Sequence, residues 1–170
     1  MTASKQDNLI DWLRDAHAME EQAEKMLSAQ AARLEHYPQL RQRIEQHIRE
    51  TQEQRQVIEG CLSRHGSSPS TLKDMGGKLM ALGQAIGGAP MSDEVIKGAI
   101  AGYVFENIEI ATYTTLIAAA AEIGDSETQR ACERILEQEK AMAAWLLEDL
   151  PATTRAFLER SADPDLTAKR

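Results

Sequence analysis

Residues 102–113 read Gly102-Tyr-Val-Phe-Glu106-Asn-Ile-Glu109-Ile-Ala-Thr-Tyr113, and this stretch places two glutamates inside an otherwise apolar segment. Apolar residues recur every three or four positions between Ile96 and Ala120, which is typical of the inward face of a bundle helix. Residues at i and i+3 share a helix face, so Glu106 and Glu109 can reach one ion or two adjacent ions. Because an unpaired carboxylate is costly to bury, the stretch predicts a helix that supplies ligands for a cation.

Three further helical segments each carry a glutamate on their own apolar stripe, namely Glu20, Glu50 and Glu139. Glu50 follows Glu20 by 30 residues, and Glu139 follows Glu109 by 30 residues. At a rise of about 1.5 Å per residue, the members of each pair come to nearly the same level when the chain folds back on itself. The sequence therefore predicts two similar helical hairpins that share one carboxylate-rich site.

Together these segments predict an all-α fold, a ferritin-like four-helix bundle that forms a single domain over residues 1–170. Long helices are expected over about residues 4–35, 38–64, 92–124 and 126–151. A long crossover, about residues 66–91, joins the second helix to the third and is expected to hold a short helix over residues 70–85. Pro151 is expected to stop the fourth helix. A short fifth helix follows over residues 153–160, and the tail over residues 161–170 is expected to fray.

Residues that begin or end helices flank the predicted segments. Pro38 suits the first turn of the second helix. Gly66 and Gly124 suit the ends of the second and third helices. Ser126 and Gln129 have the spacing of a capping box at the start of the fourth helix.

Composition and charge exclude several classes of function. The net charge of −8 and the lack of a basic tail argue against nucleic-acid binding, because phosphate neutralisation needs clustered Lys and Arg. Cys61 and Cys132 form no Cys-x-x-Cys motif and are interpreted as buried hydrophobic residues. The polar first residues contain no signal peptide, and no apolar run approaches the roughly 18 residues of a membrane span. We therefore expect a cytoplasmic protein without membrane contact.

The candidate metal ligands are glutamates on or beside the inward stripes: Glu20, Glu50, Glu53, Glu106, Glu109 and Glu139. The position of Glu53, three residues after Glu50, suits a shared ion but is equally typical of a surface glutamate. Four other side chains are expected to hydrogen-bond the ligating carboxylates from outside: His47, Gln54, Tyr103 and Tyr113. The pattern around His47 also fits a ligand or a hydrogen-bonded core histidine.

Four segments that span about residues 8–160 carry a family resemblance by their order and spacing. They are Asp11-Trp-Leu-Arg-Asp-Ala-His-Ala-Met-Glu20, Ile44-Glu-Gln-His-Ile-Arg-Glu50-Thr51, residues 102–113 as quoted above, and Leu136-Glu-Gln-Glu139-Lys140. The chain thereby resembles the YciE/YciF family of bacterial stress-associated ferritin-like proteins, and most closely its YciE branch. The resemblance implies a four-helix bundle with a fifth helix that forms homodimers.

The core is also similar to that of rubrerythrins. In that group the ligands are Glu on helix one, Glu-x-x-His on helix two, Glu-x-x-Glu on helix three and Glu-x-x-His on helix four. The glutamates match at Glu20, Glu50, Glu106, Glu109 and Glu139. Glu53 and Met142 stand at the positions of the two histidines. The resemblance thus implies an all-carboxylate site that suits manganese, magnesium or loosely held iron.

Two functions fit the sequence. The first is a ferritin-like stress-response protein that holds two metal ions, iron or manganese, and handles metal or peroxide. The alternative is a non-enzymatic bundle that acts through dimerisation or a protein partner and keeps a vestigial metal site. A third function, DNA protection by a mini-ferritin, is opposed by the net charge of −8.

Overall fold

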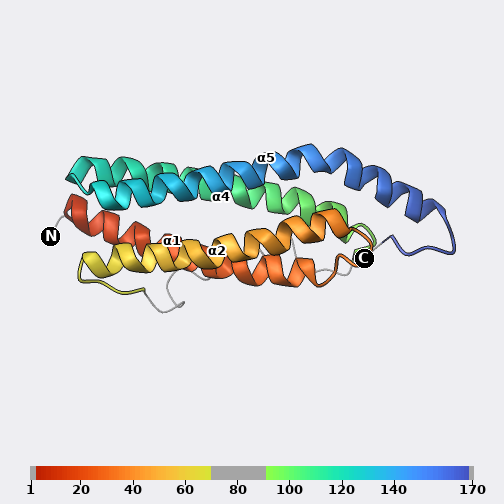
Figure 1. Cartoon of the computed structure of the whole chain (residues 1–170), viewed down its shortest axis with the longest axis horizontal. Helices are drawn as coiled ribbons and strands as arrows, with labels where there is room; N and C mark the ends of the chain where they lie inside the picture. Colours follow the sequence, from red (N-terminus) through yellow and green to blue (C-terminus); the bar gives the residue numbers. More distant parts are fainter. Residues whose placement is uncertain (1–2, 70–90, 169–170) are drawn as a thin grey trace.

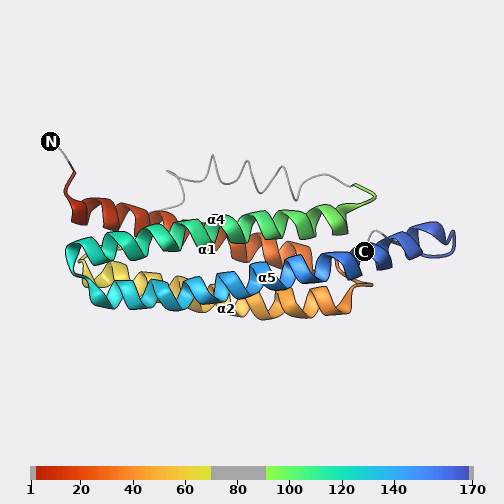
Figure 2. The ribbon, with the colours of Figure 1, turned by 90° about the horizontal axis from the view of Figure 1, so that it is seen from above.

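The computed structural model describes residues 3–69 and 91–168, and within these ranges it contains helices and no strands. The helices are α1 (Lys5–Ala31), α2 (Pro38–Arg64), α4 (Glu94–Ile123) and α5 (Ser126–Ala162). Figure 1 and Figure 2 show the α1–α2 hairpin lying lengthwise against the α4–α5 hairpin. This arrangement confirms the predicted all-α, ferritin-like bundle. The short helix expected over residues 70–85 lies outside the described residues.

Each helix packs against two others, because α1 also contacts α4 and α2 also contacts α5. Apolar side chains fill the space between the four, and Leu13, Ile58, Leu116 and Met142 are all fully buried. Midway along the bundle this apolar filling is replaced by polar side chains that are at most 1% exposed: Glu20, His47, Thr51, Gln54, Glu106, Glu109 and Glu139. Across the described ranges, no helix combines the length and apolar character that a membrane span requires.

The ends of the helices follow local chemistry. Pro38 is in the first turn of α2, and Gly124 ends α4 with a φ of 75°, a conformation that favours glycine because it has no Cβ. The cap of α5 is Asp125, whose Oδ1 accepts from the Thr128 amide at 3.0 Å, so the expected capping box at Ser126 is wrong. Asp125 is preferred there because its short carboxylate reaches an amide of the first turn.

α5 does not stop at Pro151 but continues through it to Ala162, so the prediction of a separate fifth helix is wrong. Proline removes the amide that would bond the carbonyl of Leu147, four residues earlier. Pro151 is exposed, and the Leu147 side chain is 52% exposed. This face of α5 is turned toward solvent, so water can satisfy the Leu147 carbonyl and the helix tolerates the proline.

The residues after α5 turn back toward the start of α2, as Figure 1 shows. The Tyr37 hydroxyl donates to the Ala168 carbonyl at 2.7 Å, and the Arg160 guanidinium donates to the Thr167 carbonyl at 2.8 Å. The tail was expected to fray from residue 161. Up to Ala168 it instead lies against the end of the bundle, because two side chains outside it supply hydrogen-bond donors.

Candidate metal centre

Four buried side chains from three helices converge in the middle of the bundle. His47 of α2, Glu106 and Glu109 of α4, and Glu139 of α5 each offer one ligand atom, and these atoms lie within 4.8 Å of one another. The helices bring them to one level because each sits near the middle of its helix. Groups of imidazole and carboxylate ligands at such distances suit iron, manganese or zinc.

His47 connects the buried carboxylates to Glu50. Its Nδ1 lies 2.7 Å from Glu50 Oε2, while its Nε2 lies 3.2 Å from Glu106 Oε2 and 3.4 Å from Glu139 Oε2. One imidazole nitrogen thus faces the cluster, and the other is held by a carboxylate behind the ring. Metal-binding histidines are oriented by this kind of outer hydrogen bond.

Glu20 brings α1 into the same site. It is fully buried, and its Oε1 accepts a hydrogen bond from the Tyr113 hydroxyl of α4. Glu20 is close enough to Glu106 and Glu139 for their charges to act on it. All four helices therefore contribute a titratable side chain to one buried volume.

Glu139 of α5 also contacts α2. The Gln54 amide donates to Glu139 Oε1 and, at 3.0 Å, to Gln138 Oε1. Gln54 and Thr51 are both 1% exposed and lie on the same inward face of α2 as His47. Helix α2 therefore positions Glu139 from one side, as well as contributing the imidazole.

The side chains of this volume fit a cation. Among the described residues, Glu20 Oε2, Glu109 Oε2, Thr51 Oγ1 and Gln54 Oε1 are buried without a hydrogen-bond partner. Glu106 Oε2 and Glu139 Oε2 form no hydrogen bond either, although each lies within 3.4 Å of His47 Nε2. A buried polar atom left unpaired costs roughly 1–3 kcal/mol, so a concentration of them at one level needs a physical cause. Cations that take oxygen ligands supply one.

Burial and mutual repulsion raise the pKa values of Glu20, Glu106 and Glu109. Burial, followed by the charge of Glu139, raises the pKa of Glu20 and of Glu109 well above the usual range. Burial raises the pKa of Glu106 to about 7, although the contact with His47 opposes the rise. Without a cation the cluster therefore holds protons near neutral pH, because several negative charges cannot share a water-free volume.

His47 and Glu50 behave as an ion pair. Burial alone lowers the pKa of His47, but its contacts with Glu106, Glu139 and Glu50 outweigh burial and raise the pKa well above its ordinary value. The contact with His47, assisted by Gln46 and Arg43, lowers the pKa of Glu50 to about 2 despite partial burial. Glu50 therefore stays ionised and holds the imidazole in place.

The structure does not bring all of the candidate ligands together. Glu53 is exposed on α2 and lies outside the buried cluster. Glu50 is separated from it by His47, and its side chain is 18% exposed. Tyr103 is half-buried and lies with Val104 in a groove along the outer side of α4, whereas Tyr113 lies inside. The candidate ligands that share the buried volume are Glu20, Glu106, Glu109 and Glu139.

An imidazole lies beside the buried carboxylates, because His47 faces the cluster. The family comparison placed the histidine of helix two three residues after a glutamate, where Glu53 stands. In the structure the histidine is three residues before Glu50, so the order of the two is reversed. Thr51 was missed. The inward position of Thr51 could have been recognised from the seven-residue spacing between His47 and Gln54. With 3.6 residues per turn, this spacing permits either Glu50 or Thr51 as the inward residue between them.

Comparison with known proteins identifies the family. A family model described as a domain of unknown function, DUF892, matches residues 4–159. A protein of known structure from Xanthomonas campestris pv. campestris is 42% identical, with a TM-score of 0.81 over 94% of this chain and 100% of that chain. The E. coli stress protein YciF is 23% identical, with a TM-score of 0.75 over 88% of this chain and 96% of that chain.

A more distant structure shares the ferritin-like fold. The dodecameric thioferritin of Bacteroides fragilis, a bacterioferritin-related protein, is 18% identical, with a TM-score of 0.70 over 87% of both chains. The four-helix arrangement is thus common to this chain and to proteins of very different sequence. Since the family model covers nearly all of its length, this chain belongs to the DUF892 family, which confirms the resemblance of its motifs to the YciE/YciF family.

Proposed function

We propose that this protein binds two divalent cations, iron or manganese, among its buried glutamates and uses them in stress defence, by handling the metal itself or peroxide. The observation that carries the proposal is the set of carboxylate oxygens left unsatisfied at this level in the described residues. Glu20 Oε2 and Glu109 Oε2 have no hydrogen-bond partner, and Glu106 Oε2 and Glu139 Oε2 face His47 Nε2 at 3.2 Å and 3.4 Å. Their convergence with an imidazole gives a donor set that suits both metals.

Charge balance supports two ions. The buried glutamates are Glu20, Glu106, Glu109 and Glu139, and their four negative charges equal the four positive charges of two divalent cations. Metal ligands must be deprotonated, so binding exchanges the protons of the cluster for cations. The buried cations and the buried carboxylates then neutralise each other, so no uncompensated charge remains in the interior.

The two halves of the site differ in this proposal. His47, Glu106, Glu109 and Glu139 would hold one ion, because one ligand atom of each lies within 4.8 Å of the others. Glu20, which is near enough for its charge to act on Glu109, would help to hold the second. An imidazole ligand on one side only makes the two positions unequal in affinity.

Two adjacent cations supply Lewis-acid and one-electron chemistry toward peroxide or dioxygen. The protein's own residues hold and orient the ligands. Glu50 holds the imidazole through Nδ1, the Tyr113 hydroxyl holds Glu20, and the Gln54 amide holds Glu139. The apolar residues above and below exclude water and so keep the oxygens available to a cation.

The comparisons support the stress role at the level of the family, since YciF is described as a stress protein. A cytoplasmic location and a homodimer belong to the same proposal. The outer face of α4 supports the homodimer, because Ile100 is 49% exposed and Val104 is 43% exposed there. Sedimentation velocity on the purified chain measures the oligomeric state directly.

The test of the metal site is the number of ions that each chain binds. Metal-free protein is given Fe²⁺ or Mn²⁺ without oxygen, passed through a desalting column and measured by plasma mass spectrometry. The parent chain is expected to retain close to two ions. Glu20→Gln and Glu139→Gln are expected to retain fewer, because each removes a charged ligand with little change of shape.

Glu53→Gln is the matched control, since it makes the same chemical change on the exposed face of α2. It is expected to bind like the parent chain. If the parent chain retains no metal, or if Glu139→Gln retains as much as Glu53→Gln, the proposal is wrong. The protein is then better explained as a bundle that acts through dimerisation or a protein partner. Loaded protein is finally tested for consumption of hydrogen peroxide.

A further inference from the structure

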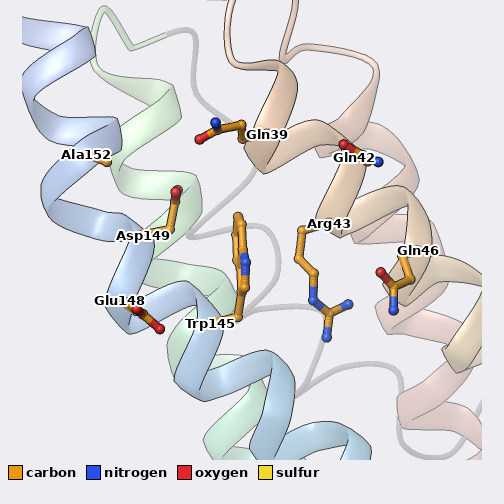
Figure 3. Close-up of a pocket in the computed structure, with 8 residues that line it drawn as sticks. All are labelled: Gln39, Gln42, Arg43, Gln46, Trp145, Glu148, Asp149 and Ala152. Carbon is orange, nitrogen blue, oxygen red and sulfur yellow. The ribbon is translucent and has the colours of Figure 1, made fainter.

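A groove between α2 and α5 lies next to the buried cluster. It has a volume of about 460 Å³, and its lining includes Arg43 and Gln46 of α2 and Trp145, Glu148 and Asp149 of α5. Figure 3 shows Arg43 and Trp145 projecting from the two helices into the space between them. The groove is therefore a place where solvent penetrates between two helices of the bundle.

Glu50 joins this groove to the buried site. Gln46 Nε2 donates to Glu50 Oε1 at 2.8 Å, and Arg43 Nη1 donates to Glu50 Oε2 at 3.3 Å. Glu50 in turn contacts His47, whose other nitrogen faces the cluster. The Glu50 side chain is 18% exposed, whereas that of Glu106 is 2% exposed. A partly exposed carboxylate thus contacts His47, a member of the buried group, directly.

The groove on the outer side of α4 has no comparable connection. Its polar side chains bond back to their own helix, with Asn107 donating to the Tyr103 carbonyl and Thr112 donating to the Ile108 carbonyl. In the part of the chain that the structure describes, none of its lining residues is hydrogen-bonded to His47, to Glu50 or to a buried glutamate, whereas Arg43 and Gln46 of the α2–α5 groove both bond Glu50. The connection to the cluster is a feature of the α2–α5 groove.

The groove has negative side chains on its α5 side and a positive side chain, Arg43, on its α2 side. Glu148 and Asp149 attract cations to the α5 side. Arg43 lies opposite them, and its guanidinium forms an ion pair with Glu50 Oε2. A cation that reaches Glu50 has to displace this guanidinium, and it is repelled by it during the approach. Arg43 and the incoming ion therefore compete for one carboxylate.

We infer that the α2–α5 groove is the route by which divalent cations reach the buried site, with Glu50 as the carboxylate that receives them and Arg43 as the gate. This inference rests on the proposed metal site. It assigns Glu50 a second task besides holding His47. It also explains why Glu50 is partly exposed while Glu20, Glu106, Glu109 and Glu139 are buried.

The inference is tested by the rate of cation uptake. Metal-free protein is mixed with Co²⁺ in a stopped-flow instrument, and its visible absorption bands report arrival at the site. Arg43→Gln is expected to take up Co²⁺ roughly tenfold faster, because a charge barrier of about 1.4 kcal/mol is removed. Gln42→Trp, which places a bulky ring at the surface of the groove, is expected to slow uptake.

Arg41→Gln is the matched control, because it removes the same charge two residues away on α2, where Arg41 pairs with Glu45. An Arg43→Gln rate no greater than that of Arg41→Gln overturns the gate, and an unchanged rate for Gln42→Trp overturns the route. The final amount of Co²⁺ bound separates the two proposals. If the parent chain binds none, the metal site itself is wrong and this inference falls with it. If binding is full and all rates agree, only the route is wrong.

Discussion

The buried cluster consists of five titratable side chains: Glu20, His47, Glu106, Glu109 and Glu139. The free energy of folding therefore depends on how many protons these side chains bind. The raised pKa values of Glu20, Glu106 and Glu109 mean that the metal-free folded state binds protons more tightly than the unfolded state. A cation removes this dependence because it compensates the same charges. Protons and metal ions are therefore competing ligands of one set of side chains.

At the residue scale, we expect the metal-free protein to lose stability as the pH rises from about 5 to about 8. The pKa of Glu106 is raised from 4.5 to about 7 on folding. The stabilising contribution of its proton is complete below the unfolded pKa and is lost as the pH rises through the folded pKa. The difference between the two pKa values of Glu106 corresponds to a decrease in the free energy of unfolding on the order of 3 kcal/mol. Urea unfolding in the presence of a chelator measures it at each pH.

Glu106→Gln is expected to reduce this slope, because the amide does not titrate. The slope is not expected to vanish, since the pKa values of Glu20 and Glu109 are shifted in the same direction. Glu53→Gln, on the exposed face of α2, serves as the control and is expected to keep the full slope. A metal-free protein whose stability rises over this pH range would contradict the electrostatic description of the cluster.

At the scale of single helices, α5 has a proline in its interior, Pro151, and remains a continuous helix on both sides of it. We expect Pro151→Ala to raise the free energy of unfolding by about 1–3 kcal/mol, because alanine restores the amide that bonds the Leu147 carbonyl and removes the clash of the ring. Thermal unfolding by circular dichroism measures this change as a rise in the melting temperature.

Pro38→Ala is the comparison for this prediction. Pro38 occupies the first turn of α2, where the amide is unpaired in any helix, so its replacement is expected to change the free energy by less than about 0.5 kcal/mol. If Pro151→Ala is neutral or destabilising, then the proline maintains a bend that the end of the bundle requires. The contact between Tyr37 and Ala168 would be the first to examine in that case.

At the scale of the whole molecule, the proposed ions link the two hairpins, because α1 and α2 contribute Glu20 and His47 while α4 and α5 contribute Glu106 and Glu139. We expect Mn²⁺ at about 100 times its dissociation constant to stabilise the folded chain by about 2.7 kcal/mol per site. For a chain of 170 residues this corresponds to a rise in melting temperature of roughly 5–10 °C for each occupied site. Melting curves with Mn²⁺ and with chelator measure it.

Glu139→Gln is expected to lose most of this rise, since Glu139 belongs to the buried group and its charge acts on both Glu20 and Glu109. Ca²⁺ at the same concentration is expected to have a smaller effect, because it prefers more and longer oxygen contacts than an imidazole-containing site offers. An equal rise in Glu139→Gln and in the parent chain would show that Mn²⁺ acts at other carboxylates on a protein of net charge −8.

Local features of the sequence were enough to predict the helical bundle and the residues that interrupt its core. Hydrophobic periodicity and the residues that start and stop helices act over a few positions, so they placed α2 at Pro38–Arg64 and ended α4 near Gly124. Glu20, Glu50, Glu106 and Glu139 stood out because leucine-like positions rarely hold carboxylates. In the structure Glu20, Glu106 and Glu139 are buried together with Glu109, whereas the Glu50 side chain is 18% exposed.

Tertiary structure alone decided how the side chains of α2 divide between the site and solvent. A helix has 3.6 residues per turn, so the inward position between His47 and Gln54 is open to Glu50 or Thr51 until neighbouring helices fix the rotation. Packing turned Thr51 inward and left Glu50 beside Arg43, which placed the imidazole against the carboxylates of α4 and α5. The passage of α5 through Pro151 was decided in the same way, because only the fold shows that this face meets water.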